Sequence, residues 1–94
     1  MSEIKHVRLV IEGRVQGVWF RGWLVQQAQA SAVRGWVRNC SNGTVEAVLS
    51  GPAATVEALV SACHVGPPAA RVSRLSVEPA APPTGPGFHP RPTL

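Results

Sequence analysis

The sequence predicts an α+β sandwich in which one antiparallel sheet carries two helices on one of its faces. Apolar residues alternate with polar ones in two stretches, two further stretches are strand-like runs, and two others show helical spacing, in the order strand, helix, strand, strand, helix, strand. This order is the split βαβ pattern of ferredoxin-like folds. The 94 residues supply apolar side chains for one modest core, so we expect a single domain over 1–94 with its core at about 5–78.

Four stretches are typical of strands. Apolar and polar residues alternate along the first and the last, and the second and third are strand-like runs that flank a turn signal. Ser41, Asn42 and Gly43 separate the second stretch from the third, and the Asn-Gly pair tolerates positive φ, which indicates an antiparallel hairpin. The predicted strands are 6–13 with Val7, Leu9 and Ile11 inward, 35–40, 44–50, and 71–78 with Leu75 and Val77 inward.

Two stretches are typical of helices, at 21–33 and 53–65, and each shows a single apolar stripe at a spacing of three or four residues. The pair Gly51-Pro52 precedes the second helix, and Gly66-Pro67-Pro68 ends it. The stripe residues are Phe20, Leu24 and Ala28 for the first helix, and Val56, Leu59, Val60 and Cys63 for the second.

Residues 79–94 are predicted to form a flexible tail around one short ordered contact. This segment holds most of the prolines of the chain, which disfavour regular structure. Residues 87–91 are expected to add a weak edge strand. It is weak because Pro90 and Pro92 would each remove one hydrogen-bond donor from its ladder, and we expect reduced stability at this end.

Composition excludes several classes of protein. No window reaches the roughly 18 apolar residues of a membrane span, and the segment MSEIKHVR is charged where a signal peptide is apolar, so we expect a cytoplasmic protein without a membrane partner. Cys40 and Cys63 lack the partners that a disulfide framework or a zinc site needs, and we expect no metal and no cofactor. The 44–50 strand has no aromatic residue of the kind that stacks on RNA, so nucleic acid is not expected as a partner.

The turn from the first strand to the first helix is the strongest candidate for chemistry. The net charge of +4 favours an anionic ligand. A loop that opens into a helix presents main-chain N–H groups without intrahelical partners, and Gly13 and Gly17 allow a ligand to approach them closely. Arg21, at the helix start, can hold two oxygens of a phosphate or carboxylate. The alternative is that the glycines only make a tight turn and Arg21 is a surface residue.

Two blocks of the chain resemble the signature blocks of the acylphosphatase family. They are GRVQGVWFR at 13–21, and GWVRN at 35–39 followed by NGTVE at 42–46. The resemblance implies a ferredoxin-like sandwich that hydrolyses acyl phosphates, R-CO-OPO3, to a carboxylate and inorganic phosphate without a metal. The implied partner is a small acyl phosphate, with inorganic phosphate or another anion as product or inhibitor.

The resemblance also implies a role for individual residues. Arg21 stands at the position of the family's phosphate-binding arginine, and Asn39 at that of the asparagine that orients the attacking water. The 15–20 loop stands at the position of the cradle whose main-chain N–H groups hold the phosphoryl oxygens. Its residues are Val15, Gln16, Gly17, Val18, Trp19 and Phe20. Because an acyl phosphate has a good leaving group, positioning and charge stabilisation serve without a strong general base.

The polar and aromatic residues near these blocks leave alternatives open. Asn39 is expected on a strand beside the first strand, facing the loop, yet an asparagine at a strand end often bonds its own backbone. Asn42 belongs to the hairpin turn and receives no catalytic role. Trp19 and Trp23 either wall the substrate site or pack against the core, and Trp36 is expected to pack on the sheet.

The main rival to an enzyme is a non-catalytic anion-binding or regulatory acylphosphatase-like domain. Such a domain would need Arg21 but not Asn39, so turnover separates the two. Cys40 follows Asn39 where relatives often carry a hydroxyl residue, and this is expected to lower the rate without abolishing it. A small domain of this kind is expected to be a monomer.

Overall fold

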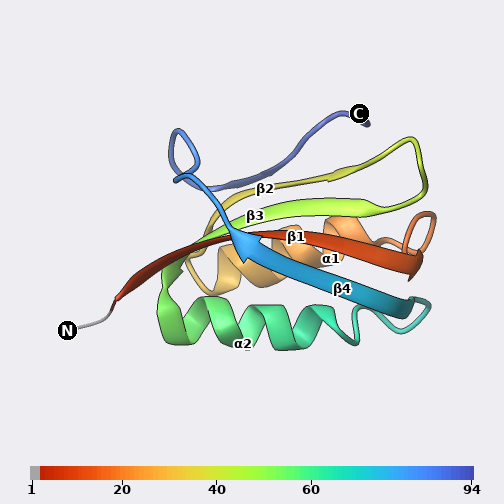
Figure 1. Cartoon of the computed structure of the whole chain (residues 1–94), viewed down its shortest axis with the longest axis horizontal. Helices are drawn as coiled ribbons and strands as arrows, with labels where there is room; N and C mark the ends of the chain where they lie inside the picture. Colours follow the sequence, from red (N-terminus) through yellow and green to blue (C-terminus); the bar gives the residue numbers. More distant parts are fainter. Residues whose placement is uncertain (1–2) are drawn as a thin grey trace.

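The computed structural model describes residues 3–94 as a five-stranded sheet with both helices on one side of it (Figure 1). The strand order is β4-β1-β3-β2-β5, and α1 lies against β2 and β5 while α2 lies against β3 and β1. No helix in this part of the chain is long and apolar enough to cross a bilayer. The elements are β1 (Ile4–Arg14), α1 (Phe20–Ala30), β2 (Arg34–Asn39), β3 (Val45–Pro52), α2 (Ala53–Cys63), β4 (Arg71–Pro79) and β5 (Phe88–Pro90).

The prediction of an antiparallel sheet is right for four strands and wrong for the fifth. β1 pairs antiparallel with β3 and β4, and β2 pairs antiparallel with β3. β5 runs parallel to β2, so the sheet is mixed. The long connection from β4 to β5 returns the chain to the far edge of the sheet, where it lies beside β2 (Figure 1).

The prediction that Pro90 and Pro92 weaken the hydrogen-bond ladder of the last strand is wrong. Gly35 N–H donates to the carbonyl of Gly87 at 3.0 Å, and Arg91 N–H donates to the carbonyl of Val37 at 2.8 Å. Successive residues of a strand direct their N–H groups to opposite sides. Pro90 and Pro92 therefore lack an N–H only on the free edge, where no ladder bond is lost.

The apolar stripes face the core as predicted, and the outermost strand shows the one departure. Val77 is 48% exposed because β4 is an edge strand, and the helix on this side of the sheet, α2, packs on β1 and β3. Burial raises the pKa of the Cys63 thiol to about 12, which keeps it protonated within the core. The buried stripe residues are Val7, Leu9 and Ile11 in β1, Phe20, Leu24 and Ala28 in α1, and Val56, Leu59 and Cys63 in α2.

Two local structures differ from their predicted form. α1 ends at Ala30 rather than at 33 because Ala32 takes φ 57, and Val33 N–H bonds back to Ala28 O at 2.9 Å. This is a Schellman termination without its usual glycine, so no sequence signal marks it. The hairpin has a three-residue loop in which only Gly43 takes positive φ, at 93°, rather than an Asn-Gly turn with two such residues.

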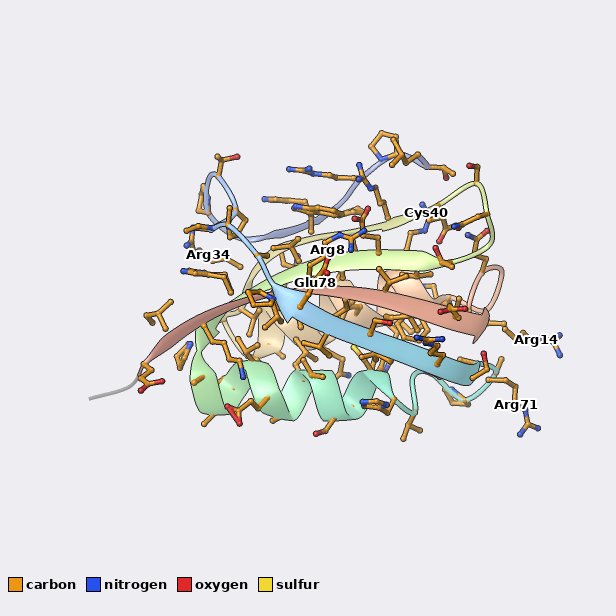
Figure 2. The ribbon with its side chains drawn as sticks, viewed as in Figure 1. Arg8, Arg14, Arg34, Cys40, Arg71 and Glu78 are labelled. Atoms are coloured by element: carbon orange, nitrogen blue, oxygen red, sulfur yellow. The ribbon has the colours of Figure 1, made fainter. Side chains whose placement is uncertain are left out.

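The sheet face turned away from the helices carries a charge network centred on Glu46. Arg8 Nε donates to one carboxylate oxygen of Glu46 at 2.5 Å, and Arg38 Nε donates to the other at 2.7 Å. Arg8 also donates to Glu78 at 2.6 Å, and Figure 2 shows these two side chains together on this face. On the same strand as Arg38, the ring of Trp36 contacts two guanidinium groups, with the guanidinium carbons of Arg38 and Arg91 at 4.7 and 4.5 Å from its centroid.

We predict that Glu46→Gln lowers the free energy of unfolding by about 2 kcal/mol at pH 7, because two charge-assisted hydrogen bonds weaken. Burial opposes ionisation of Glu46, but the hydrogen bonds from Arg38 and Arg8 and their charges outweigh it, and the pKa of the carboxyl lies below its ordinary value of 4.5. A depressed pKa contributes stability above the unfolded-state pKa, and that stability disappears as the pH falls through the folded-state value. Urea unfolding of both proteins should therefore converge as the pH drops below 4.5.

Glu12→Gln is the matched control for this measurement. The Glu12 side chain is 44% exposed and lies 3.8 Å from Arg74, so its substitution should change stability by less than about 1 kcal/mol at any pH. If the stability difference between Glu46→Gln and the wild-type protein were undiminished at pH 3, it would not arise from the ionised carboxylate of Glu46.

Candidate functional site

A pocket of about 430 Å³ lies where the β1–α1 loop meets the end of β2. Arg21, from the first turn of α1, and Asn39, the last residue of β2, both line it. Two segments that are separate in the sequence thus present one cationic and one amide side chain to the same space. The complete lining is Val15, Gly17, Trp19, Phe20, Arg21, Gly22, Asn39 and Pro90.

The loop presents an uninterrupted run of unpaired main-chain donors. Within residues 3–94, no N–H group between 16 and 22 donates to a backbone acceptor, and the first that does so is Trp23, which bonds Trp19 O at 3.0 Å. The helix also has no side-chain cap at its N-terminus. These N–H groups and the helix dipole together favour an anion at this position.

The two glycines assigned to this turn have separate roles. Gly17 lines the pocket with φ 73, and an added Cβ would meet nothing within 4 Å, so only its backbone conformation requires glycine. Gly13 does not line the pocket. It sits at a bulge in β1, and an added Cβ would lie 2.2 Å from the carbonyl oxygen of Arg71 on β4. Gly13 therefore serves strand pairing rather than the cradle.

Arg21 is the one ionisable residue among those that line the pocket. No carboxylate of residues 3–94 forms an ion pair with its guanidinium, and in the same range no group of three or more His, Cys, Asp or Glu side chains could hold a metal ion. Arg14 and Arg71 are cross-strand partners, and Figure 2 shows both projecting from the end of the molecule where the loop lies. The local field at this end is positive, and Arg21 has its donors available for a ligand.

The expectation that Asn39 lies on a strand beside β1 is wrong, because β3 separates β1 from β2. The loop instead crosses the end of β3 to reach Asn39. Its side-chain link is Gln16, whose Nε2 donates to the carbonyls of Cys40 and Thr44, each at 2.8 Å. Leu94 N–H donates to the carbonyl of Asn39 at 3.1 Å from the other side. The backbone around Asn39 is thus held from both flanks.

The structure separates the two tryptophans near the loop. Trp19 is 59% exposed and lines the pocket, whereas Trp23 is half-buried and packs edge-on against Phe20, with 5.4 Å between ring centroids. Trp19 is therefore at the pocket rather than in the core, whereas Trp23 packs against the core.

Sequence reasoning missed three contributors to the site, and two of its loop residues do not line the pocket. Gln16 points to the hairpin, and Val18 packs against the core. The side-chain role of Gln16, the presence of Gly22 and the presence of Pro90 were not anticipated. Gly22 carried a weak signal as a glycine inside a helical pattern, while Pro90 carried none, because its place depends on the parallel pairing of β5.

Comparison with known proteins gives consistent results. The sequence model described as Acylphosphatase matches residues 7–90. A protein of Rhodospirillum rubrum named Acylphosphatase is 52% identical over 91 residues, which cover 97% of this chain and 100% of that protein. The structure of an acylphosphatase from Coxiella burnetii superposes with a TM-score of 0.89 at 32% identity, over 94% of this chain and 93% of that one. The acylphosphatase of Bacillus subtilis superposes with a TM-score of 0.86 at 31% identity, over 95% and 99%.

We predict that Gln16→Ala destabilises the protein by about 1–2 kcal/mol, because the partly buried carbonyls of Cys40 and Thr44 each lose a hydrogen-bond donor. Urea unfolding measures this loss. Gln26→Ala is the matched control, since Gln26 is exposed on α1 and its substitution should leave stability within about 0.5 kcal/mol of the wild-type value. Equal effects of the two substitutions would show that the Gln16 amide does not hold the loop to the hairpin.

Proposed function

The chain belongs to the acylphosphatase family, and we propose that its pocket hydrolyses the carboxyl-phosphate bond of acyl phosphates, with the 15–20 loop and Arg21 holding the phosphoryl group and Asn39 orienting water. The observation that carries these assignments is the pocket itself. It combines a row of unpaired N–H groups, an arginine without an ion-pair partner and an amide side chain. Each of these groups matches one requirement of phosphoryl transfer.

Binding of the phosphoryl group is the first requirement. The N–H groups of the loop bond its non-bridging oxygens, and the Arg21 guanidinium bonds two oxygens through its planar fork. Charge on these oxygens persists through the transition state of phosphoryl transfer, so the same donors stabilise it without rearrangement. Arg21 is placed at the first turn of α1, where the helix dipole adds to its own charge.

Placement of the attacking water is the second requirement. The Asn39 amide accepts one hydrogen bond from the water and donates another to it, which aligns the water oxygen with the phosphorus. The water oxygen forms a bond to phosphorus as the bond from phosphorus to the acyl oxygen breaks, and the carboxylate leaves with the electron pair. One proton of the water passes to a phosphate oxygen of the product, and the other stays on the attacking oxygen, which becomes a phosphate hydroxyl. This proton transfer needs no side-chain base, and the pocket lining contains no carboxylate, imidazole or thiol.

The remaining parts of the proposal concern the state and place of the protein. We propose that it acts as a monomer in the cytoplasm, without a metal or other cofactor, and that inorganic phosphate binds as product or inhibitor. The free thiols of Cys40 and Cys63 fit a reducing compartment.

We predict metal-independent hydrolysis of benzoyl phosphate near neutral pH in the presence of a chelator. Arg21→Ala should lower kcat/KM by about 10²-fold or more and abolish phosphate binding, because it removes the charged donor pair. Asn39→Ala should lower kcat by about 10²-fold while phosphate still binds, because only the water loses its orientation. Steady-state kinetics and titration with inorganic phosphate measure the two effects separately.

Two controls complete this experiment. Circular dichroism checks that each variant is folded, and Arg21→Lys tests the contribution of the guanidinium geometry. Lysine keeps the charge but not the planar fork, so activity should return only in part. A folded wild-type protein that binds phosphate without turnover would exclude the enzyme and favour the non-catalytic anion-binding domain. Equal loss of phosphate binding in both alanine variants would contradict the division of roles.

We predict that Gly17→Ala weakens phosphate binding several-fold, whereas Gly43→Ala leaves it unchanged. Both glycines have positive φ, at 73° and 93°, and an added Cβ meets nothing within 4 Å at either site. Both substitutions should therefore cost about 1–2 kcal/mol of stability through backbone strain alone. Only Gly17 belongs to the cradle, so only its substitution tilts N–H groups away from the anion. Phosphate titration compared with urea unfolding distinguishes the two effects.

A further inference from the structure

Trp19 lines the pocket, yet the roles assigned above use only its main-chain N–H. Its backbone takes φ 66 and ψ 26, a left-handed conformation that is unfavourable for a bulky residue. Its side chain is 59% exposed, although the core beside it accommodates both Phe20 and Trp23. The chain thus holds a large aromatic ring at the pocket rim in a strained conformation, and core packing does not account for it.

The absence of a side chain at position 22 fixes where this ring lies. A Cβ built on Gly22 would lie 2.1 Å from Nε1 of Trp19, 2.6 Å from Cε2 and 2.7 Å from Cδ1. The five-membered part of the indole therefore rests directly on the first turn of α1, in space that only glycine leaves open. Glycine inside a helix is unfavourable relative to alanine, so its presence here is consistent with this packing.

The pocket has a polar part and an apolar part. The loop N–H groups, Arg21 and Asn39 form the polar part, where the phosphoryl group and the water are proposed to bind. The remaining rim includes the exposed ring of Trp19 and the ring of Pro90 from β5. An acyl phosphate has the same division, with a charged phosphoryl group at one end and the acyl group at the other.

We propose that Trp19 forms the acyl-binding wall of the pocket and gives preference to acyl phosphates with a flat apolar acyl group, such as an aromatic ring. The proposal rests on the acyl phosphate hydrolysis proposed above. The indole offers a rigid face for offset stacking or edge contact with such a group. A small acyl group such as acetyl reaches little of this surface, so it gains little from it. Because the contact is made with the part of the substrate that does not react, Trp19 is a specificity residue.

The test is the ratio of kcat/KM for benzoyl phosphate to kcat/KM for acetyl phosphate. In Trp19→Ala this ratio should fall by about three- to tenfold, the change expected from the loss of one aromatic contact. Trp19→Phe should retain most of the ratio, because a flat ring remains. The ratio cancels any change in phosphoryl binding that the substitution causes through the loop. Trp23→Phe is the matched control, and it should leave the ratio unchanged because Trp23 does not line the pocket.

Gly22→Ala gives a second, independent test that leaves the tryptophan at position 19 unsubstituted. Its methyl group displaces the indole, so the ratio should fall as in Trp19→Ala, and the tryptophan fluorescence should shift in emission. This variant also serves if Trp19→Ala fails to fold, because alanine favours the helix.

The outcomes separate this inference from the function on which it rests. A wild-type protein that hydrolyses neither substrate would overturn the proposed function. A wild-type protein that hydrolyses both, with the same ratio in Trp19→Ala, Gly22→Ala and Trp23→Phe, would overturn the role of Trp19 alone. A fall in the ratio for Trp19→Ala and Gly22→Ala, but not for Trp23→Phe, supports it.

Discussion

The order of the strands determines how the β1–α1 loop and the end of β2 come together to form the pocket. Because β3 lies between β1 and β2, the loop that leaves β1 must cross the end of β3 before Arg21 and Asn39 can face the same pocket. Gln16 makes this crossing stable by donating to two carbonyls of the β2–β3 hairpin. Within residues 3–94, the loop N–H groups make no backbone hydrogen bond, so these donors remain available for an anion.

The distribution of charge supports the same arrangement. Glu46 and Glu78 are bound by arginines on the open face of the sheet, and Glu12 and Glu57 lie next to Arg74 and Lys5 at the surface. None of these carboxylates lines the pocket. Carboxylates are therefore neutralised where they strengthen the sheet, while the pocket keeps an arginine, a helix N-terminus and a positive field for a phosphorylated substrate.

Backbone conformation links the loop to the chemistry. Gly17 and Trp19 both take positive φ, and the N–H groups of this stretch have no backbone partner within residues 3–94. Such a turn is unfavourable for the free chain, so packing must hold it. Phe20 and Val15 are buried in the core on either side of it, and Trp19 rests on the bare backbone of Gly22. Packing on both sides thus holds the loop in this conformation.

The sequence by itself determined the elements, their buried faces and the two blocks that resemble a family, because these depend on periodicity and on contiguous residues. Tertiary structure alone decided that β5 is parallel, that Pro90 lies at the pocket and costs no ladder bond, and that Gly13 lies at a bulge while Gly17 lines the pocket. It also decided that Gln16 braces the hairpin and that Trp19, not Trp23, faces the pocket. Each of these outcomes depends on a neighbour supplied by a distant part of the chain, and a local pattern holds no information about which neighbour that is.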